Sequence, residues 1–354
     1  MSCPIIALDA RLVGGTNTGD STYWSGLIEG LAHGDCGLDF LLFSNAPRPQ
    51  GIPNCRNIRW IEVASRSNRW WSYVAFPLAA RKMGARAIHT QYSLSPLAGS
   101  LGITTVHDVS FFIGPEWFRP RDRLILQRTV PASVKRAARV IAVSHTCQRE
   151  IEHFIPKAKG KVRAIYNGLP SWIARDTAPD TTLDRLQVQK PFMLTVGTRW
   201  PRKNMSLAVE AAKQLDGIDL VVTGKPGWGD QPEGSRVKAV GYVTNAELCS
   251  LYSAASLYLA PSRHEGFGIP VIEAFACGCP VICSTGGALP EVAGDAAEIE
   301  PTWDPDHWAA TIRELLADSS KLEILRQKGT ERARQFDWKE SARQTVEVYQ
   351  EVLG

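Results

Sequence analysis

The chain has 354 residues, of which 44% are hydrophobic and 21% are charged, and its formal net charge is +4. This composition is ordinary for a globular protein, and the length predicts about two domains. No apolar run reaches the roughly 18 residues that cross a membrane, which excludes a membrane-spanning chain. The N-terminal residues 1–6 carry no charged region before their apolar positions, so we expect no signal peptide.

The eight cysteines form no C-x-x-C pair, and no histidine cluster completes a zinc set beside Cys277 and Cys279. We expect most of them to be buried apolar residues. This usage predicts a reducing, cytoplasmic compartment and no structural metal.

Charge is divided unevenly along the chain. Residues 1–170 hold 21 Lys and Arg against 11 Asp and Glu, whereas residues 171–354 hold 19 against 25. Such a division indicates two halves with different partners. The basic half faces an anionic surface, such as a membrane leaflet or a phosphorylated acceptor, or it is a solvated face.

In chain order, the first half alternates strand-like apolar runs with helical patterns, which predicts a parallel sheet covered on both faces. A glycine-bearing loop follows the first strand, and Asp20 is the expected N-cap of the next helix. The loop is neither a G-x-G-x-x-G motif nor a P-loop, because no Lys-Ser or Lys-Thr pair follows Gly19. The predicted strands are 4–10, 39–43, 58–63, 87–90, 103–108 and 140–144, and residues 162–168 close the first domain.

Three segments of this half are candidates for binding a ligand or a membrane. His107 and Asp108 end a predicted strand, where open α/β sheets bind ligands, although a lone histidine there is usually structural. Residues 65–73 place arginines beside paired tryptophans, which suits a lipid interface or a helix start whose tryptophans pack on the sheet. Residues 115–139 form a basic amphipathic region, either a membrane-docking face or a solvated one.

The second half begins after a polar, proline-bearing stretch at 170–190 that fits a linker. The turn after its first strand carries Arg202 and Lys203, which are well placed for a diphosphate; the alternative is a solvated basic pair. Further predicted elements are strands at 192–197 and 218–224, a capping box at 244–247, and a helix start at Asp304 and Pro305.

Residues 255–278 combine a buried strand, a glycine-bearing turn and the start of a helix. Pro270 suits the first helical turn, and Gly278 suits the helix end. The turn directs three amides out of the helix N-terminus, which is an anion site. These amides belong to Gly266, Phe267 and Gly268.

Two carboxylates flank these donors, Glu265 on the turn and Glu273, which we expect in the first helical turn. Groups that only accept hydrogen bonds, beside an array of N–H donors, suit a ligand with both hydroxyls and phosphates. A nucleotide-activated sugar is such a ligand. For Glu273 the alternative is a carboxylate that complements the helix dipole.

The run E-G-F-G-I-P-V-I-E-A at 265–274 resembles the E-x7-E signature of retaining glycosyltransferases with the two-domain GT-B fold, sequence family 4 in particular. The similarity continues at 278–282 and 286–296. It spans nearly the whole chain and is strongest over 192–297.

The resemblance implies an α/β fold of two Rossmann-like parallel-sheet domains that face each other across a cleft. Residues 1–169 would form the acceptor-side domain and 170–336 the nucleotide-sugar domain. Residues 337–354 would form a helix that crosses back to the first domain. The chain departs from the family at 19–23, where G-x-G-R-Y is common and Gly-Asp-Ser-Thr-Tyr stands here, so the basic residue is missing.

The resemblance also implies roles for individual residues around the donor. Glu265 would bind hydroxyls of the donor sugar, and Glu273 would bind the nucleotide ribose. Arg202 and Lys203 would bind the donor phosphates and stabilise the leaving diphosphate, with Arg199 as a further contact.

Five further residues receive roles in the same way. His107 would face the donor sugar, with Asp108 as its orienter or as a structural hydrogen-bond acceptor. Backbone groups around Gly241 and Val243 would hold the nucleotide base. The loop at Gly19 would approach the donor phosphates or the acceptor.

The predicted function is metal-independent transfer, with retention, of a hexose from a nucleotide-diphosphate sugar to a saccharide or lipid-linked saccharide acceptor. The pattern looks most like mannosyltransferases of bacterial polysaccharides, which makes GDP-mannose a candidate donor. We expect no cofactor and no nucleic-acid partner, and peripheral contact of the basic half with an anionic membrane at the inner face of the plasma membrane. The alternatives are a sugar-nucleotide epimerase, a phosphorylase or disaccharide synthase, and a non-catalytic nucleotide-sugar-binding scaffold.

Overall fold

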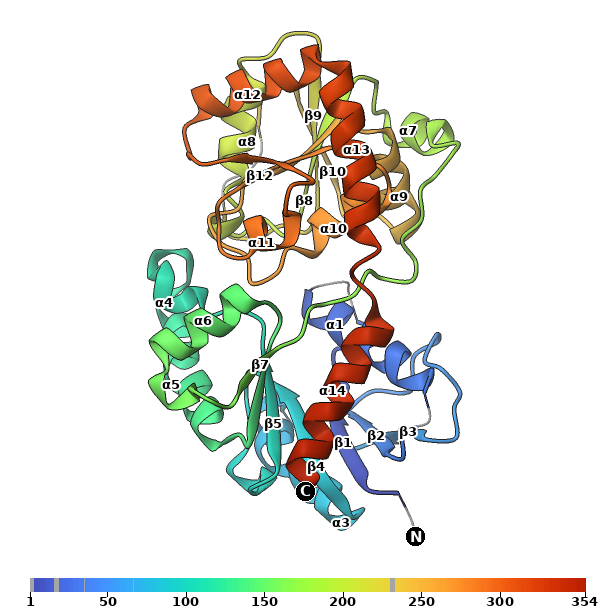
Figure 1. Cartoon of the computed structure of the whole chain (residues 1–354), viewed down its shortest axis with the longest axis vertical. Helices are drawn as coiled ribbons and strands as arrows, with labels where there is room; N and C mark the ends of the chain where they lie inside the picture. Colours follow the sequence, from blue (N-terminus) through green and yellow to red (C-terminus); the bar gives the residue numbers. More distant parts are fainter. Residues whose placement is uncertain (1–2, 16–18, 35, 66, 230–232) are drawn as a thin grey trace. The chain divides into compact units, whose positions relative to one another are not determined.

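The computed structural model describes residues 3–15, 19–34, 36–65, 67–229 and 233–354. The chain divides into two compact units, each with its own sheet (Figure 1). The N-terminal unit comprises Met1–Pro115, Arg119–Gly168 and Asp337–Gly354, and the C-terminal unit comprises Glu116–Phe118 and Leu169–Phe336. Within the described ranges, no helix combines the length and the apolar character that a membrane crossing needs.

Seven parallel strands form the sheet of the N-terminal unit, in the order β3-β2-β1-β4-β5-β6-β7. The order reverses between β1 and β4, the kind of position at which open α/β sheets bind ligands. The strands are β1 Ile5–Asp9, β2 Asp39–Ser44, β3 Ile58–Glu62, β4 Ala85–Gln91, β5 Gly102–Val106, β6 Arg139–Ala142 and β7 Val162–Ala164. The helical elements are α1 Gly19–Ala32, α2 Asn68–Trp70, the π-helix η1 Trp71–Ala75, α3 Phe76–Lys82, η2 Pro96–Ala98, α4 Ser110–Ile113, α5 Pro120–Arg136, α6 His145–Phe154, η4 Pro156–Ala158 and α14 Trp338–Leu353. The short helix η3 Pro115–Trp117 spans the boundary between the two units.

Six parallel strands form the sheet of the C-terminal unit, in the order β10-β9-β8-β11-β12-β13. The strands are β8 Phe192–Val196, β9 Asp219–Thr223, β10 Val237–Gly241, β11 Leu257–Ala260, β12 Val281–Ser284 and β13 Glu298–Glu300. The helical elements are α7 Asp180–Leu186, η5 Pro201–Lys203, α8 Met205–Ala212, α9 Asn245–Ala254, α10 Ile269–Ala276, α11 Leu289–Ala293, α12 Pro305–Ala317 and α13 Ser319–Ala333.

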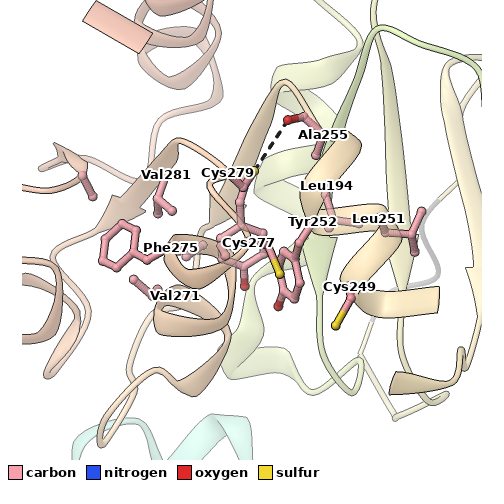
Figure 2. Close-up of a cluster of buried hydrophobic side chains, with 14 of the residues drawn as sticks. Leu194, Cys249, Leu251, Tyr252, Ala255, Val271, Phe275, Cys277, Cys279 and Val281 are labelled. Atoms are coloured by element: carbon pink, nitrogen blue, oxygen red, sulfur yellow. Dashed lines mark hydrogen bonds between the residues drawn. The ribbon is translucent and has the colours of Figure 1, made fainter. Parts of the chain in front are cut away.

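Alternate residues of the C-terminal strands face two different hydrophobic layers. Val221 of β9 belongs to a layer shared with α9 and α10, which Figure 2 shows around Tyr252 and Phe275. Its neighbours Leu220 and Val222 belong to a layer shared with α8 and α12. A parallel sheet buried on both faces confirms the α/β class predicted from the unbroken apolar runs.

Local signals in the sequence marked several helix ends correctly and some incorrectly. Thr244 and Glu247 form the capping box of α9, and Asp304 caps α12. Asp20, however, lies inside the first turn of α1, so its prediction as the N-cap is wrong. The predicted linker at 170–190 is also partly wrong, because it contains α7.

The structure shows which cysteines and which of the paired tryptophans are buried. All eight cysteines lie in the described part, and five of them are buried, as expected. Trp71 is buried and stacks on Phe76 with ring centroids 4.8 Å apart, whereas Trp70 is 55% exposed. Only Trp71 therefore packs into the fold, as the helix-start interpretation requires.

Helix α14 packs on α1 (Figure 1). The contact is so close that Gly26 and Gly30 of α1 have no room for a side chain. A Cβ atom on Gly26 would lie 2.0 Å from the Trp338 ring, and one on Gly30 would lie 2.2 Å from the Trp338 carbonyl oxygen. The absence of these side chains is what allows the two helices to approach.

Gly30→Ala is expected to lower the free energy of unfolding by about 1–3 kcal/mol, because the added methyl group meets backbone rather than a flexible side chain. Chemical denaturation checks this. Gly34→Ala is the matched control, since a Cβ there meets nothing within 4 Å. Equal stability of the two variants would contradict the prediction.

Candidate active site

Two loops of the C-terminal unit meet where β8 and β11 end. These strands are paired neighbours, with Tyr258 opposite Leu194. The loop after β8 runs through η5, and the loop after β11 carries Glu265 towards the start of α10. Because the carboxyl ends of parallel strands share one edge, side chains 62 residues apart in the sequence are in contact here.

The Glu265 carboxylate binds three side chains at this edge. Lys203 Nζ lies 2.6 Å from Oε1, and Arg202 Nη1 lies 2.9 Å from Oε2. Ser262 Oγ donates a further hydrogen bond to Oε1, at 2.6 Å. Burial alone would raise the pKa of Glu265, but Lys203, Arg202 and the Ser262 hydrogen bond outweigh it and hold the pKa far below its usual range. These four residues, the Glu265 cluster, therefore contain an ionised carboxylate that is shielded from water.

The backbone around Glu265 is held by a neighbouring glycine turn. The Glu265 amide donates to the Gly286 carbonyl oxygen at 3.3 Å, and the Ala288 amide donates to the Glu265 carbonyl oxygen at 2.8 Å. Gly287 adopts a φ of +62°, and a Cβ there would lie 2.3 Å from the Glu265 carbonyl oxygen. A residue with a side chain would be strained here and would displace the carboxylate.

Glu273 lies in the second turn of α10, so its prediction in the first helical turn is wrong, and with it the simple dipole explanation. Its side chain is buried, and Oε2 accepts a hydrogen bond from the Tyr252 hydroxyl at 3.1 Å. Burial raises the pKa of Glu273 to about 7, with the Tyr252 hydrogen bond acting in the opposite direction. The pKa values of Glu265 and Glu273 thus move in opposite directions from their usual range.

A small pocket opens beside the Glu265 cluster. Its polar lining includes Thr195, Lys203 and Glu265, and its apolar lining includes Val271 and Leu289. A pocket with a few polar groups on apolar walls suits a ligand that has both characters.

The turn between Glu265 and α10 brings two of its predicted residues into well-defined positions. Gly268 occupies the position before α10 with a φ of +103°. Phe267 is buried, and its ring meets that of Phe336 edge-on with centroids 5.5 Å apart. The role of Gly266, Phe267 and Gly268 as an anion site stays a prediction.

The residues predicted to bind the base and a phosphate lie along the same sheet edge. Gly241 ends β10, and its carbonyl oxygen accepts hydrogen bonds from the Thr223 hydroxyl at 2.7 Å and the Gly224 amide at 2.9 Å. Val243 is buried in the layer shared with α9 and α10. Arg199 Nε is buried and has no hydrogen-bond partner among the described residues.

His107 and Gly19 belong to the N-terminal unit. His107 follows β5, and its Nε2 atom lies 3.8 Å from Asp20 Oδ1. Burial lowers the pKa of His107, while Asp20 and Asp108 raise it in part. Asp108 Oδ1 accepts hydrogen bonds from the amide and hydroxyl of Ser110, as the structural alternative requires, and its role as the orienter of His107 stays a prediction.

Sequence reasoning missed two members of the C-terminal site. Ser262 lies three residues before Glu265, and Tyr252 lies 21 residues before Glu273. A hydroxyl three residues from a glutamate is too common a pattern to mark a site, and no local signal links Tyr252 to α10. Among the described residues, no group of three or more His, Cys, Asp or Glu side chains is placed to hold a metal ion.

Comparisons with known proteins agree with this arrangement. Residues 184–335 match the family described as "Glycosyl transferases group 1", and residues 19–171 match "Glycosyltransferase Family 4". The O-antigen chain mannosyltransferase B of Escherichia coli is 32% identical over 269 residues, which cover 70% of this chain and 69% of that protein. The O-antigen chain mannosyltransferase RfbU of Salmonella typhimurium is 28% identical, over 69% of this chain and 70% of that protein.

Among solved structures, the sucrose-phosphate synthase of Thermosynechococcus elongatus is similar over 99% of both chains, with a TM-score of 0.78 and 24% identity. This likeness supports the GT-B class of fold, two Rossmann-like parallel-sheet units. Family matches in both halves, and a relative above 30% identity over most of its length, carry the assignment further. The chain belongs to the family 4, group 1 glycosyltransferases.

Proposed function

We propose that this glycosyltransferase moves a hexose from a nucleotide-diphosphate sugar to a saccharide or lipid-linked saccharide, with retention of configuration and without a metal ion. The Glu265 cluster is the observation that carries the proposal. It places two cations, Arg202 and Lys203, at the carboxyl edge of a Rossmann-like sheet, beside a pocket. Two convergent cations at this edge suit a diphosphate.

Mannose is the first candidate for the transferred hexose. Two relatives with long alignments are O-antigen chain mannosyltransferases by name. GDP-mannose is accordingly the lead donor. This choice rests on relatives and not on a contact to the base.

The cluster suggests how the difficult step is assisted. Departure of the nucleoside diphosphate leaves negative charge on a phosphate while the anomeric carbon becomes positive, and fixed cations stabilise that charge without reorganising. Glu265 keeps Arg202 and Lys203 in place. Its Oε2 accepts one hydrogen bond and Oε1 accepts two, and a carboxylate has about four acceptor sites, so Oε2 can also receive a sugar hydroxyl. On the proposed mechanism, the acceptor attacks from the same face and the leaving phosphate takes its proton.

Calorimetric titration of the full chain with GDP, UDP, dTDP, ADP and their sugar conjugates tests the donor site. The proposal expects one nucleotide to bind most tightly and to lose affinity in Lys203→Ala and Glu273→Ala. The matched control is Lys213→Ala, an exposed lysine paired with Glu210. If none of the nucleotides or conjugates binds, the proposed function fails.

Turnover is expected to stay within about two-fold of its initial value after treatment with EDTA, because Arg202 and Lys203 supply the positive charge that a metal ion would otherwise supply. The measurement is the initial rate of donor consumption before and after chelation. Loss of activity that magnesium or manganese restores would contradict metal independence.

We also propose that the protein works at the cytoplasmic face of an anionic membrane, through the N-terminal unit. Ile113, Leu124 and Phe154 are exposed apolar residues of α4, α5 and α6, and Arg121 and Arg128 are exposed on α5. Apolar side chains among cations match the interface of a bilayer with anionic lipids.

Leu124→Glu is expected to weaken co-sedimentation with phosphatidylglycerol-containing vesicles about ten-fold, since it replaces inserted apolar surface with a repelled charge. Ile324→Glu on α13 is the control, because Ile324 is an exposed apolar residue of the other unit. Equal binding of wild type and Leu124→Glu, or equal binding to phosphatidylcholine vesicles, would refute membrane docking by this face.

A further inference from the structure

Among the described residues, four buried side-chain atoms on or just after β4 and β5 have no hydrogen-bond partner, and two of them lie at the carboxyl ends of these strands; the other two are Thr90 Oγ1 and Thr104 Oγ1. His107 Nε2 and Gln91 Oε1 have no hydrogen-bond partner among the described residues. Gln91 Nε2 donates to the Asp20 carbonyl oxygen at 3.1 Å, which ties β4 to the first turn of α1. Buried polar atoms in native proteins are nearly always paired, so two such atoms at a ligand-binding edge indicate a missing ligand.

The groups around these atoms are rigidly held. The Tyr23 ring meets the His107 ring edge-on with centroids 4.9 Å apart. The Tyr23 hydroxyl is hydrogen-bonded to Thr105 Oγ1 at 2.8 Å, and the same oxygen is 2.8 Å from His89 Nε2. A buried chain of hydrogen bonds therefore fixes Tyr23, the ring against which His107 packs.

Tyr92, which follows β4, adds a strained element to the same place. Its φ is +56°, in the left-handed region that residues with side chains rarely adopt, and its ring lies 5.6 Å from that of His107. Such a conformation costs about 1–3 kcal/mol and persists where the surrounding structure enforces it, typically at functional sites.

The charges at this edge favour hydroxyl groups over phosphate. Asp20 presents a carboxylate that is 43% exposed, 3.8 Å from His107 Nε2, and Gln91 adds an amide oxygen. Carboxylate and amide oxygens accept hydrogen bonds from hydroxyls, whereas a carboxylate repels a phosphate. Arg11, which follows β1, forms an ion pair with Asp9: Arg11 Nε lies 2.9 Å from Asp9 Oδ1, and Arg11 Nη2 lies 2.7 Å from Asp9 Oδ2.

The geometry points to an acceptor site at the ends of β4 and β5 that takes a neutral sugar by its hydroxyls, with Asp20 and Gln91 as the residues that select it over a phosphorylated sugar. This inference rests on the proposed function and names the acceptor class. It also gives a purpose to the departure at 19–23, where an acidic residue is present and the basic residue common in the family is not.

Binding of methyl α-mannoside and of mannose 6-phosphate to the full chain tests the inference, by saturation-transfer NMR in the absence of donor. The neutral glycoside is expected to bind at least ten-fold more tightly. Asp20→Asn is expected to weaken its binding about ten-fold, and Asp20→Lys to reverse the preference towards the phosphate. Asp122→Asn is the control, because Asp122 also lies in the first turn of a helix of this unit.

The affinity of the same variants for the donor nucleotide separates this inference from the proposed function. Loss of sugar binding with unchanged nucleotide affinity supports a neutral acceptor site. An equal loss of nucleotide-sugar affinity in Asp20→Asn would assign the site to the donor hexose and overturn the inference. Preference for mannose 6-phosphate, or binding of neither probe, would overturn it as well, while nucleotide binding at the Glu265 cluster would leave the proposed function standing.

Discussion

Lys203→Ala is expected to lower kcat about 100- to 1,000-fold, the usual effect of removing one fixed donor from a developing negative charge. Lys203 Nζ is held 2.6 Å from Glu265 Oε1 and also lines the pocket, so it needs no rearrangement to meet a phosphate there. The variant should remain folded, because Arg202 and Ser262 still compensate the Glu265 carboxylate. Initial rates at saturating donor measure the loss of kcat, and circular dichroism shows whether the variant is folded.

Two further variants show whether the loss of kcat is specific to the Glu265 cluster. Lys213→Ala removes an exposed lysine from a surface pair with Glu210 and should leave kcat unchanged. Glu265→Gln keeps the shape of the side chain but removes the charge that holds both cations, so it should also lower kcat strongly. Normal turnover in Lys203→Ala would remove the phosphate role of the Glu265 cluster.

Glu273→Gln is expected to remove one pH-dependent contribution to the free energy of unfolding between about pH 4.5 and 8. Burial raises the pKa of Glu273 from its ordinary 4.5 to about 7, so the folded state binds the proton more tightly than the unfolded state. The stability linked to this proton is fully present below the ordinary pKa and is lost as the pH rises through 7. The loss amounts to about 3 kcal/mol.

The amide of Glu273→Gln is neutral at every pH, so the free energy of unfolding of this variant, minus that of wild type, should increase by about 3 kcal/mol from pH 4.5 to pH 8. Denaturant titrations of the full chain at several pH values measure this difference. Glu210→Gln, the same change at an exposed site, is the matched control. A flat difference for Glu273→Gln would mean that its carboxyl group titrates normally.

Helix ends and strand runs were readable from the sequence because their signals are local. The Thr244 capping box and the proline at the start of α12 are written within a few residues. Their hydrogen bonds join neighbours in the chain, so no tertiary information is needed. Asp20 shows the limit of this logic: the same residue type also suits a first helical turn, and α1 starts one residue earlier, at Gly19.

The motif at 265–274 and its resemblance to a family gave the chemistry of the site, but not its organisation. Arg202, Lys203 and Glu265 were assigned separate roles, yet they form one cluster joined by Ser262. That cluster exists because β8 and β11 pair although two other strands lie between them in the sequence.

Taken alone, the sequence determined most of the strands, the caps of α9 and α12, and which residues could bind a nucleotide sugar. Only the tertiary structure decided that Glu265 is ionised among two cations while Glu273 is buried beside Tyr252. It also decided that α14 packs on α1. The physical reason is that periodicity and capping depend on adjacent residues, whereas strand order, burial and pKa depend on contacts between distant ones.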